Sequence, residues 1–389
     1  MVVPRTAIIA TRVYEPEGTA AAYRLGNLTR ALERIGFQVT VLTSQSPAAR
    51  RSSPQVRRWP VLRDRSGAVR GYLQYASFDL PLAFRLLFSR RVDVVVVEPP
   101  PTTGVVARVV CQIRRIPYVY FSADVTSAAI AAVGVNRLVV KVVTAMERWV
   151  LDGAAAVLAV TEGVLKELEE LGTDRATITV VGTGIDTAQF AAEGEVEPVD
   201  HPYFIYAGTM SEFQGAMVFI DAFAKVALGH SDVRLVMFGG GVDRDALKER
   251  SRPFADQISF PGFVGAEVIA RWTRGATASL ASVRPGVGYD FALPTKTLAS
   301  VACGTPVIFA GTGPLRELVA SHGLGWSVDW DADQVAAAMR EALNGLRRRL
   351  GPEVIQWLGE NYSSAAVGDR AAAAVARVVD DAIDQGTSS

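Results

Sequence analysis

Short apolar runs alternate with longer amphipathic segments along the whole chain. In the first half, the apolar runs are rich in β-branched residues and predict strands at 6–10, 38–43, 93–97, 118–121, 155–160 and 178–181. The segments between them, such as 20–35 and 164–171, repeat apolar residues at helical spacing. Strands that alternate with helical segments are typical of a parallel sheet with covering helices.

The second half repeats the same alternation. Strands are predicted at 204–207, 234–238, 257–260, 277–281, 306–309 and 326–328, and helices at 216–227, 245–250, 268–273 and 334–347. Between the halves, residues 191–201 are polar and acidic, contain Pro198 and precede Pro202, which is typical of a linker. Two helical segments, 354–360 and 365–383, follow the second half. Ligands of open parallel sheets bind outside the carboxyl ends of the strands, so we expect an active site between the two domains.

Length and composition agree with two globular domains. A chain of 389 residues is too long for one ordinary core, and 49% hydrophobic with 21% charged residues excludes a disordered chain. The longest apolar runs, 94–97 and 154–160, are far shorter than the ~20 residues that span a bilayer. The first ten residues lack the apolar region of a secretory signal, so we expect a cytoplasmic protein. Cys111 and Cys303 lie in apolar helical patterns and predict buried free thiols rather than a disulfide or metal site.

Charge is balanced overall but uneven along the chain. The formal net charge is zero, which removes any global argument for nucleic-acid binding. Residues 1–100, however, hold 15 Arg against 7 acidic residues, and residues 50–70 hold seven Arg and one Asp. This segment could face an anionic membrane or a phosphate-bearing acceptor. The alternative, which we favour, is a solvated loop. Of the 40 basic residues, 35 are Arg, so codon bias explains the abundance of arginine before any function does.

The most informative segment is 288–307, which predicts a loop, a short helix and the start of a strand. Pro294 suits the first turn of that helix and Gly304 suits the position after its end. Lys296, one of only five lysines, falls in the first turn beside Thr295, where unpaired backbone N–H groups favour anions. We therefore predict that Lys296 binds a phosphate group.

The same segment resembles the donor-site helix of family 4 glycosyltransferases, in the branch that has Pro-Ser/Thr-Lys before the helix and Ala-x-Gly-x-Pro-Val after it. Further segments follow in the order and approximate spacing of that family: 17–20, 98–104, 122–124, 147–149, 161–163 and 182–190. The resemblance covers most of the chain. It implies an α/β protein of the GT-B fold, with two Rossmann-like, doubly wound parallel-sheet domains that face each other across a cleft.

On that resemblance we expect three parts: an acceptor domain at 1–195, a nucleotide-sugar donor domain at 202–364, and a helix at 365–389 that crosses back to the first domain. The implied activity is transfer of a sugar from a nucleoside-diphosphate sugar to a hydroxyl acceptor, with retention. The nucleotide sugar is a co-substrate, and no metal or other cofactor is expected. The partners expected are that donor and a small-molecule or lipid-linked acceptor, with no nucleic acid. The Arg-, Ala- and Val-rich composition is typical of a GC-rich genome, which would fit an actinobacterial cell-envelope or natural-product pathway.

Candidate site residues follow from these positions. The turn after the first strand and the matching turn of the second domain supply small or neutral polar residues where the family binds acceptor or diphosphate: Gly18, Thr19, Gly208, Thr209 and Gln214. The loop that resembles the cover of the nucleotide base supplies Gly262, Phe263 and Val264. The loop and helix of the donor site, with one preceding arginine, supply Arg284, Asp290, Phe291, Pro294, Thr295 and Lys296.

Two carboxylates are candidates for the chemistry. Asp124 stands where many relatives have a polar residue near the acceptor, and it could accept a proton from an acceptor hydroxyl or simply end a strand. Asp290 stands in place of a family Glu that contacts the donor sugar. Neither the three histidines nor any cysteine cluster competes for these roles.

The sequence also departs from the family. Thr209 and Gln214 replace an Arg and a Lys that bind the donor pyrophosphate, so Arg284 and Lys296 must supply the positive charge. Ala299 replaces the Glu that holds the ribose, and helical spacing is expected to turn Ser300 by ~100° toward another face. These losses keep two alternatives open: a non-catalytic subunit that binds a partner transferase or a sugar nucleotide, and a sugar-nucleotide epimerase of the same fold.

Overall fold

The computed structural model describes residues 4–17, 19–46, 49, 53, 55–64, 69, 71–132, 135–287, 293–345 and 349–387. Its contacts divide the chain into two compact units, each built around its own parallel sheet. Unit 1 contains residues 1–184 and 364–389, and unit 2 contains residues 185–363. The predicted linker 191–201 belongs to unit 2, where the Arg274 guanidinium donates hydrogen bonds to the carbonyls of Ala191 and Glu195.

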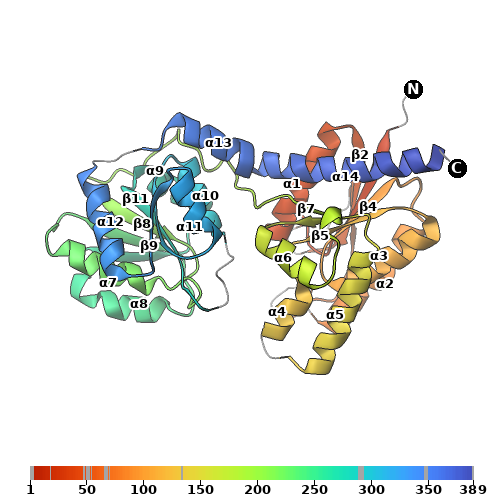
Figure 1. Cartoon of the computed structure of the whole chain (residues 1–389), viewed down its shortest axis with the longest axis horizontal. Helices are drawn as coiled ribbons and strands as arrows, with labels where there is room; N and C mark the ends of the chain where they lie inside the picture. Colours follow the sequence, from red (N-terminus) through yellow and green to blue (C-terminus); the bar gives the residue numbers. More distant parts are fainter. Residues whose placement is uncertain are drawn as a thin grey trace. The chain divides into compact units, whose positions relative to one another are not determined.

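Unit 1 is a seven-stranded parallel sheet covered by helices on both faces (Figure 1). Its strands are β1 (Arg5–Ala10), β2 (Phe37–Ser44), β3 (Val56–Trp59), β4 (Val94–Val97), β5 (Tyr118–Ser122), β6 (Ala156–Ala159) and β7 (Ile178–Val180). Its α-helices are α1 (Ala20–Arg34), α2 (Tyr72–Leu87), α3 (Pro101–Arg114), α4 (Thr126–Ala132), α5 (Arg137–Asp152), α6 (Glu162–Glu170) and α14 (Ser364–Thr387). A short 3₁₀ turn, Arg175–Thr177, precedes β7.

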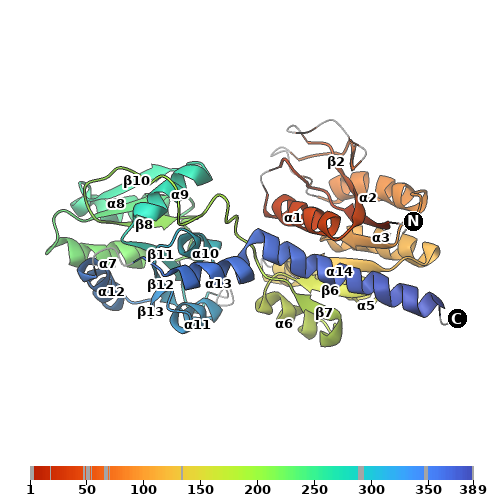
Figure 2. The same cartoon turned by 90° about the horizontal axis from the view of Figure 1, so that it is seen from above.

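The strand order of unit 1, β3-β2-β1-β4-β5-β6-β7, reverses direction between β1 and β4. On one face, α1 and α14 pack side by side over the sheet, as Figures 1 and 2 show, and contribute residues such as Leu28 and Val375 to one core. The helices α2, α3, α5 and α6 build a second core on the opposite face, where Leu82 and Val150 are buried. Both faces of the central strands are therefore dry, which explains their continuous apolar runs.

Unit 2 is a six-stranded parallel sheet. Its strands are β8 (Tyr203–Ala207), β9 (Arg234–Phe238), β10 (Ile258–Gly262), β11 (Ala278–Val283), β12 (Val307–Gly311) and β13 (Gly325–Val328). Its α-helices are α7 (Met217–Ala227), α8 (Arg244–Ser251), α9 (Ala266–Gly275), α10 (Thr295–Ala302), α11 (Pro314–Ser321), α12 (Ala332–Asn344) and α13 (Pro352–Tyr362). A 3₁₀ turn at Arg252–Phe254 follows α8.

The strand order of unit 2, β10-β9-β8-β11-β12-β13, reverses between β8 and β11. One core lies under α7 and α12, and the other face carries α10, α11 and α13 with a smaller cluster under α9. In a doubly wound sheet, the reversal leaves a crevice beyond the carboxyl ends of the two central strands. The segment after β8 reaches the end of β11 at that point, where the Arg284 N–H donates a 2.9 Å hydrogen bond to the Phe213 carbonyl.

All twelve predicted strands are confirmed, with ends that differ by three residues or fewer. The elements that the sequence analysis did not identify include β3, α2 and α11. The interpretation of residues 50–70 as a solvated loop was wrong in part, because Val56–Trp59 forms the edge strand β3, paired with β2 through residues such as Val41 and Val56. Its pattern of alternating half-buried and exposed residues, with two arginines, resembles a polar loop because only one side of an edge strand is paired.

Candidate functional site

Helix α10 begins and ends close to where the sequence placed it. Pro294 is its N-cap rather than a residue of the first turn, and Lys296 is the second helical residue. Cys303 is the C-cap, and Gly304 follows with a φ of +69°, the left-handed conformation that glycine adopts without a steric cost. The helix thus presents its first unpaired N–H groups toward the strand ends of unit 2.

Lys296 is held by two neighbours from the β8 region. Its Nζ donates a hydrogen bond of 2.6 Å to Oε1 of Gln214 and lies 4.1 Å from the ring centre of Tyr206. Burial lowers the pKa of the amine to about 7. No carboxylate compensates the ammonium within this contact set, so an incoming anion would gain a charge-assisted hydrogen bond without breaking an ion pair.

A cavity of about 420 Å³ lies beside Lys296 and entirely within unit 2. Its lining comes from the strand ends at Gly208, Thr209 and Gly239, from α9, and from α10 at Thr295 and Lys296. Lys296 is the only charged residue among the described residues that line it. A mostly apolar cavity with one cation and the start of a helix suits an apolar ring that carries an anionic group.

Gly208 is required by the position of Lys296. A Cβ atom on Gly208 would lie 3.1 Å from both Cε and Nζ of Lys296, and the backbone φ of +156° also disfavours a side chain there. Gly239 is equally constrained, because a Cβ atom would lie 2.1 Å from the Gly208 carbonyl oxygen. The two glycines let the backbone approach Lys296 closely and leave the space open for a ligand.

The segment after β10 covers another side of the same cavity. Gly262 has a φ of +88°, and the register of β10 against β9 shifts at this residue. Phe263 and Val264 both line the cavity, although Phe263 is 84% exposed. An exposed phenyl ring at the edge of a cavity is a surface on which a planar base can stack.

The structure does not bring Arg284 into this cavity. Its guanidinium lies 3.3 Å from Oε1 of Glu212 and 5.6 Å from the ring of Trp330, and Arg284 is not among the residues that line the cavity. Gln214 is also outside the lining and acts through its bond to Lys296. Within the described residues, Lys296 is therefore the cation of the cavity.

Ala299 of α10 stands where the family has the Glu that holds the ribose. Ala299 lines the cavity with its methyl group. The expectation that Ser300 points to another face was wrong, because Ser300 lines the same cavity and its hydroxyl donates to the Lys296 carbonyl, as helical serines often do. Three other candidates, Gly18, Asp290 and Phe291, lie outside the described residues.

A second polar cluster lies where β1 and β4 end in unit 1. Buried Glu98, the residue after β4, accepts a 2.6 Å hydrogen bond from the hydroxyl of Thr11, which follows β1. Arg24 of α1 lies 3.5 Å from the other carboxylate oxygen of Glu98 and over the ring of Phe121. Burial raises the pKa of the Glu98 carboxyl, and Arg24 and Thr11 oppose that shift.

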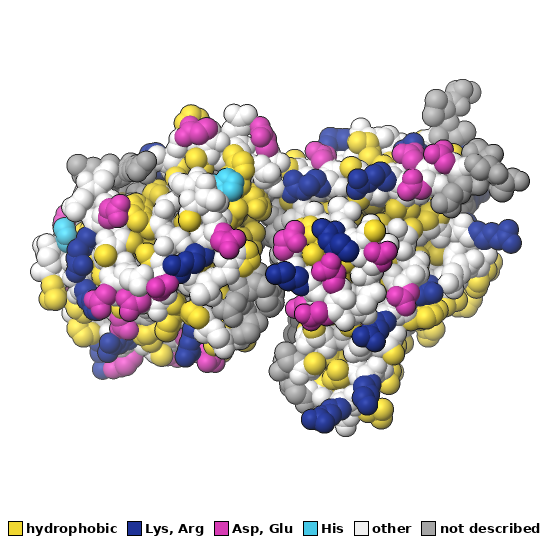
Figure 3. Space-filling model, in the orientation of Figure 1, with side chains coloured by type: hydrophobic (Ala, Val, Ile, Leu, Met, Phe, Trp, Pro, Cys, Tyr) yellow, Lys and Arg dark blue, Asp and Glu magenta, His cyan; other side chains and the backbone are white. Residues whose placement is uncertain are grey.

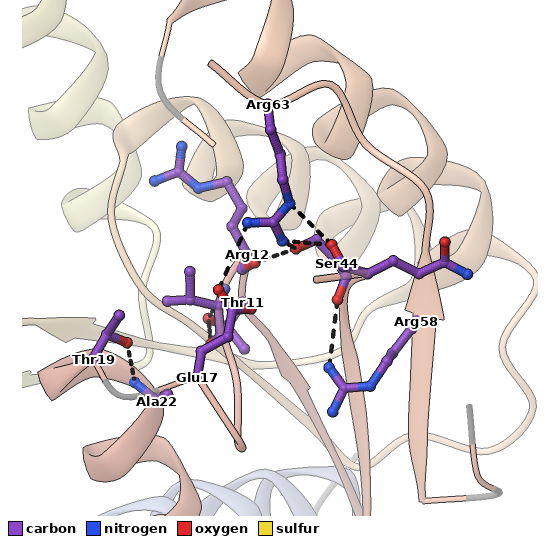
Figure 4. A network of polar contacts seen from close by, with 10 residues as sticks. Thr11, Arg12, Glu17, Thr19, Ala22, Ser44, Arg58 and Arg63 are labelled. Carbon is purple, nitrogen blue, oxygen red and sulfur yellow. Dashed lines mark hydrogen bonds and ion pairs between the residues drawn. The ribbon is translucent and has the colours of Figure 1, made fainter. Parts of the chain in front are cut away.

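Arginines surround the same strand ends (Figure 4). Arg12 donates to the carbonyl of Pro99 at 3.2 Å, and its guanidinium lies 4.2 Å from the ring of Tyr75. Arg63 donates to the Ser44 hydroxyl at 2.8 Å and lies 3.6 Å from the Glu17 carboxylate. This unit therefore offers several guanidinium groups at the reversal point of its sheet.

Asp124 follows β5 beside that cluster. Its carboxylate makes no hydrogen bond to a described residue, whereas Glu147 accepts the two backbone N–H bonds at the start of α4. Partial burial raises the pKa of the Asp124 carboxyl, and Arg24 opposes that shift. Asp124 therefore does not cap α4; the residue as a whole is solvent-exposed, although its carboxyl group is partly desolvated by its neighbours.

Thr19 has a structural role that the sequence did not assign. It is the N-cap of α1, and its hydroxyl oxygen accepts a 3.1 Å hydrogen bond from the Ala22 N–H (Figure 4). The sequence interpretation also missed Arg12, Arg24 and Glu98 as site residues. The signal that could have found them was their position, since Arg12 and Glu98 each follow a buried strand next to the reversal.

Three further features of the described residues concern reactive thiols, metal-ligand clusters and membrane-spanning helices. Cys111 and Cys303 are buried free thiols, as predicted, and burial raises the pKa of Cys111 to about 12. The described residues contain no group of three or more His, Cys, Asp or Glu side chains placed to hold a metal ion. Across the same residues, no helix combines the length and apolar composition needed to cross a membrane.

Both halves of the chain match known domain families. Residues 19–184 match the family described as "Glycosyl transferase 4-like domain", and residues 201–345 match "Glycosyl transferases group 1". The first match falls in unit 1 and the second in unit 2. The cavity beside Lys296 thus lies in the unit that contains the group 1 match.

Individual proteins give more distant matches. A D-inositol 3-phosphate glycosyltransferase of Xylanimonas cellulosilytica is 29% identical over 230 residues, which cover 52% of each chain. A 2-deoxystreptamine glucosyltransferase of Streptomyces kanamyceticus is 27% identical over 199 residues, 48% of this chain and 50% of that protein. The chain therefore spans about half the length of these curated relatives.

Solved structures match over nearly the full length. A sucrose-phosphate synthase from Thermosynechococcus elongatus has a TM-score of 0.68 at 15% identity, covering 99% of this chain and 100% of that one. HepE of Anabaena, solved with UDP and glucose, has a TM-score of 0.67 at 14% identity, covering 95% and 99%. The chain has the GT-B fold, and with the two domain matches this supports a GT-B glycosyltransferase.

Proposed function

We propose that this chain, which carries both domains of a GT-B glycosyltransferase, transfers a sugar from a nucleoside-diphosphate sugar to a hydroxyl acceptor. The observation that carries the proposal is Lys296 beside the start of α10, as the sole cation of a cavity with no carboxylate among its described lining residues. A leaving diphosphate needs fixed positive charge where its own charge develops. Lys296 and the first N–H groups of α10 supply that charge.

The donor fits the cavity in two parts. The diphosphate would displace the Gln214 amide oxygen from Lys296 or share the ammonium with it, because Nζ can donate three hydrogen bonds. The nucleoside base would pack against Phe263 and Val264 on the opposite side. Ala299 offers the ribose no hydrogen bond, and the Ser300 hydroxyl in the same lining already donates to the Lys296 carbonyl, so we expect the diphosphate and the base to carry most of the donor affinity.

On the acceptor side, we propose that Asp124 is the general base that takes the proton from the acceptor hydroxyl. Asp124 is an exposed residue whose carboxylate makes no hydrogen bond to a described residue, and partial desolvation raises its pKa, which brings its basicity closer to that of a useful general base. Arg24, whose charge opposes that shift, would orient an acceptor that carries a negative charge. Retention of configuration and a place in natural-product or cell-envelope glycan synthesis rest on the family resemblance; a relative named 2-deoxystreptamine glucosyltransferase supports the natural-product pathway.

Replacing Lys296 tests the donor site. Lys296→Ala should weaken binding of the nucleoside-diphosphate sugar by ~1.5–3 kcal/mol, the range for a hydrogen bond to a charged group. Titration calorimetry with UDP, GDP and dTDP sugars first identifies the donor and then measures the loss. Folding should be retained, because the variant removes a buried cation.

The matched control is Lys225→Ala in α7, which loses the same charge from an exposed ion pair with Asp333. Its donor affinity should equal that of the unmodified chain. Equal donor affinity in Lys296→Ala and Lys225→Ala would remove Lys296 from the site.

Replacing Asp124 tests the acceptor side. Asp124→Asn should lower kcat by about 10²–10⁴-fold, the range for loss of a general base, while donor affinity stays unchanged. Steady-state kinetics with the identified donor and acceptor, together with donor calorimetry, separate the two effects. A variant with full kcat would show that Asp124 takes no proton.

The proposed leaving-group stabilisation uses helix and side-chain charges, so we propose that turnover needs no added metal. Activity should be the same with EDTA as with magnesium or manganese. Loss of activity in EDTA and its recovery with either ion would refute this assignment.

The two alternatives predict different products. A non-catalytic subunit would bind a nucleotide sugar without releasing nucleoside diphosphate in the presence of any acceptor. An epimerase would interconvert sugar nucleotides without an acceptor, and one structural neighbour is described as a putative UDP-N-acetylglucosamine 2-epimerase of Listeria monocytogenes. Chromatography of the nucleotide products with and without acceptor distinguishes all three.

A further inference from the structure

A second cavity, of about 560 Å³, lies in unit 1 on the face of the sheet that α2 covers. It runs along the first half of β1 and the adjacent part of β2, and segment 88–92 between α2 and β4 closes it. Four arginines line it, Arg57, Arg85, Arg90 and Arg91, and its described lining includes no acidic residue. It shares no lining residue with the Thr11 and Glu98 cluster or with the Lys296 cavity.

Two of these arginines lie together without a counter-ion. The Arg85 guanidinium donates a 2.6 Å hydrogen bond to the backbone carbonyl of Arg57, and its Nη1 atom is buried without a hydrogen-bond partner among the described residues. Burial, with a smaller effect from Arg57, lowers the pKa of Arg85 to about 10. A half-buried guanidinium with one buried, unbonded nitrogen is unfavourable, and a bound anion would reduce that cost.

Asp93, the acidic residue that follows segment 88–92, is already engaged. Asp93 accepts hydrogen bonds from the Thr6 N–H at 2.7 Å and from the Thr6 hydroxyl at 2.8 Å. It is 3.5 Å from Nε of Arg91, an exposed contact at the limit of an ion pair. Arginine binds phosphate in a bidentate manner, so the chemistry of the cavity suits a phosphate group.

An exposed apolar stripe on α2 ends at this cavity. It consists of Leu73, Leu80, Phe84, Leu87 and Phe88, whose spacing places them on one side of the helix. Phe84 is 63% exposed, and Phe88, which also lines the cavity, is 76% exposed. The opposite side of α2, with Phe78 and Leu82, is buried in the unit 1 core. A helix that is apolar on both sides presents a second apolar surface that a partner outside the unit would cover.

The charged residues around the stripe indicate which kind of surface would fit it. Helix α3 packs beside α2 and contains no acidic residue, while exposed Ile113 extends the apolar surface. The single acidic residue of α2, Asp79, is buried and accepts a 2.7 Å hydrogen bond from Thr103. Figure 3 shows hydrophobic side chains gathered where α2 and α3 lie. Exposed apolar side chains next to arginines, without exposed carboxylates on either helix, are complementary to an anionic lipid surface.

We propose that this face of unit 1 docks on an anionic phospholipid membrane, with a headgroup phosphate in the arginine cavity and the α2 stripe against the acyl chains. The proposal does not depend on the glycosyl-transfer activity. It replaces the looser expectation that the arginines of segment 50–70 contact a membrane, since Arg57 is the one arginine among the described residues of that segment that lines the cavity.

Vesicle co-sedimentation tests it with the full chain. Vesicles of phosphatidylcholine with phosphatidylglycerol should bind the protein, and vesicles of phosphatidylcholine alone should bind it much more weakly. The double variant Arg57→Gln/Arg85→Gln should bind about 30-fold more weakly, because each arginine near an anionic membrane contributes roughly a factor of five. The control Arg250→Gln/Arg252→Gln in unit 2 loses the same charge from exposed ion pairs and should bind like the unmodified chain.

The apolar arm uses Phe84→Ser/Phe88→Ser, with Leu228→Ser/Val242→Ser as the control at exposed apolar residues of unit 2. Only the first pair should weaken vesicle binding. Thermal melts check folding, and the Arg57→Gln/Arg85→Gln variant should melt no lower than the unmodified chain, because it removes a half-buried guanidinium that has no carboxylate partner among the described residues.

Three outcomes would overturn the proposal. They are equal binding to neutral and anionic vesicles, an arginine variant that binds like its unit 2 control, and no vesicle binding at all. In the last case, a rise in melting temperature with inorganic phosphate that disappears in Arg57→Gln/Arg85→Gln would assign the cavity to a free phosphate instead.

Discussion

At the scale of single residues, the chemistry of unit 2 depends on the charge of one amine. Burial brings the pKa of Lys296 to about 7, so near neutral pH the amine is charged in only about half of the molecules. The folded pKa is below the ordinary value for lysine, so the unfolded chain binds more protons between the two values. Stability therefore rises with pH across that window.

Donor binding should have the opposite pH dependence. A diphosphate favours the charged amine, so binding takes up a proton and the affinity should fall about fivefold between pH 7 and pH 8. A nucleotide sugar should be used, since its diphosphate has no terminal group that titrates there. Calorimetry in two buffers of different ionisation enthalpy measures the proton uptake directly.

The control is Lys296→Gln, which cannot titrate. Its weaker donor affinity should not change between pH 7 and pH 8. A Kd for the unmodified chain that is constant over this range would contradict a lowered pKa in the free protein.

Residue roles were predictable from the sequence only where they depend on local structure. Lys296 was found because Pro294 and Gly304 indicate the ends of a short helix within a dozen residues. Glu98 and Arg24 were not found as a pair, because their contact joins positions 74 residues apart along the chain. Arg284 was assigned to the diphosphate on charge alone, and the structure pairs it with Glu212.

At the scale of elements, α10 depends on how it ends as well as how it starts. Gly304 has a left-handed φ, and a Cβ atom there would lie 3.1 Å from Nη2 of Arg349. Gly304→Ala should therefore destabilise the protein by about 1–2 kcal/mol, the usual cost of that conformation for a residue with a Cβ atom. Urea unfolding of the variant measures the change, and the affinity of donor for the folded variant should be unaffected.

A glycine in an ordinary helical conformation provides the comparison. Gly359 lies inside α13, and a Cβ atom added there would have no neighbour within 4 Å. Gly359→Ala should stabilise the protein slightly, because alanine loses less backbone entropy in a helix. Equal effects at the two positions would show that the left-handed turn after α10 is not required.

Element prediction was accurate for buried strands and poor for the outer helices of unit 1. Central strands such as β4, β5 and β11 are buried on both faces, and a continuous apolar run is a clear signal of that environment. Helix α2 was missed because apolar residues lie on both of its sides, which removes the one-sided pattern that predicts a surface helix. The edge strand β3 was missed for the opposite reason, since half of its residues are polar.

At the scale of the whole molecule, repetition was the most useful signal. Two successive alternations of strands and helices predicted two parallel-sheet domains, and the structure contains two such units. The order of strands within each sheet could not be derived from the alternation alone. The strand order determines where each sheet reverses. Lys296 of α10 and Glu98 after β4 both lie near the strand ends at these reversal points.

The discontinuity of unit 1 has a consequence for synthesis on the ribosome. Helix α14 follows all of unit 2 in the sequence, yet its residues Val367, Val375 and Val379 complete the core that α1 begins. The ribosome must therefore translate unit 2 before the surface of α1 that α14 covers can be closed. A nascent chain interrupted within unit 2 would expose that surface to chaperones and proteases, so completion of unit 1 distinguishes a finished chain from an interrupted one.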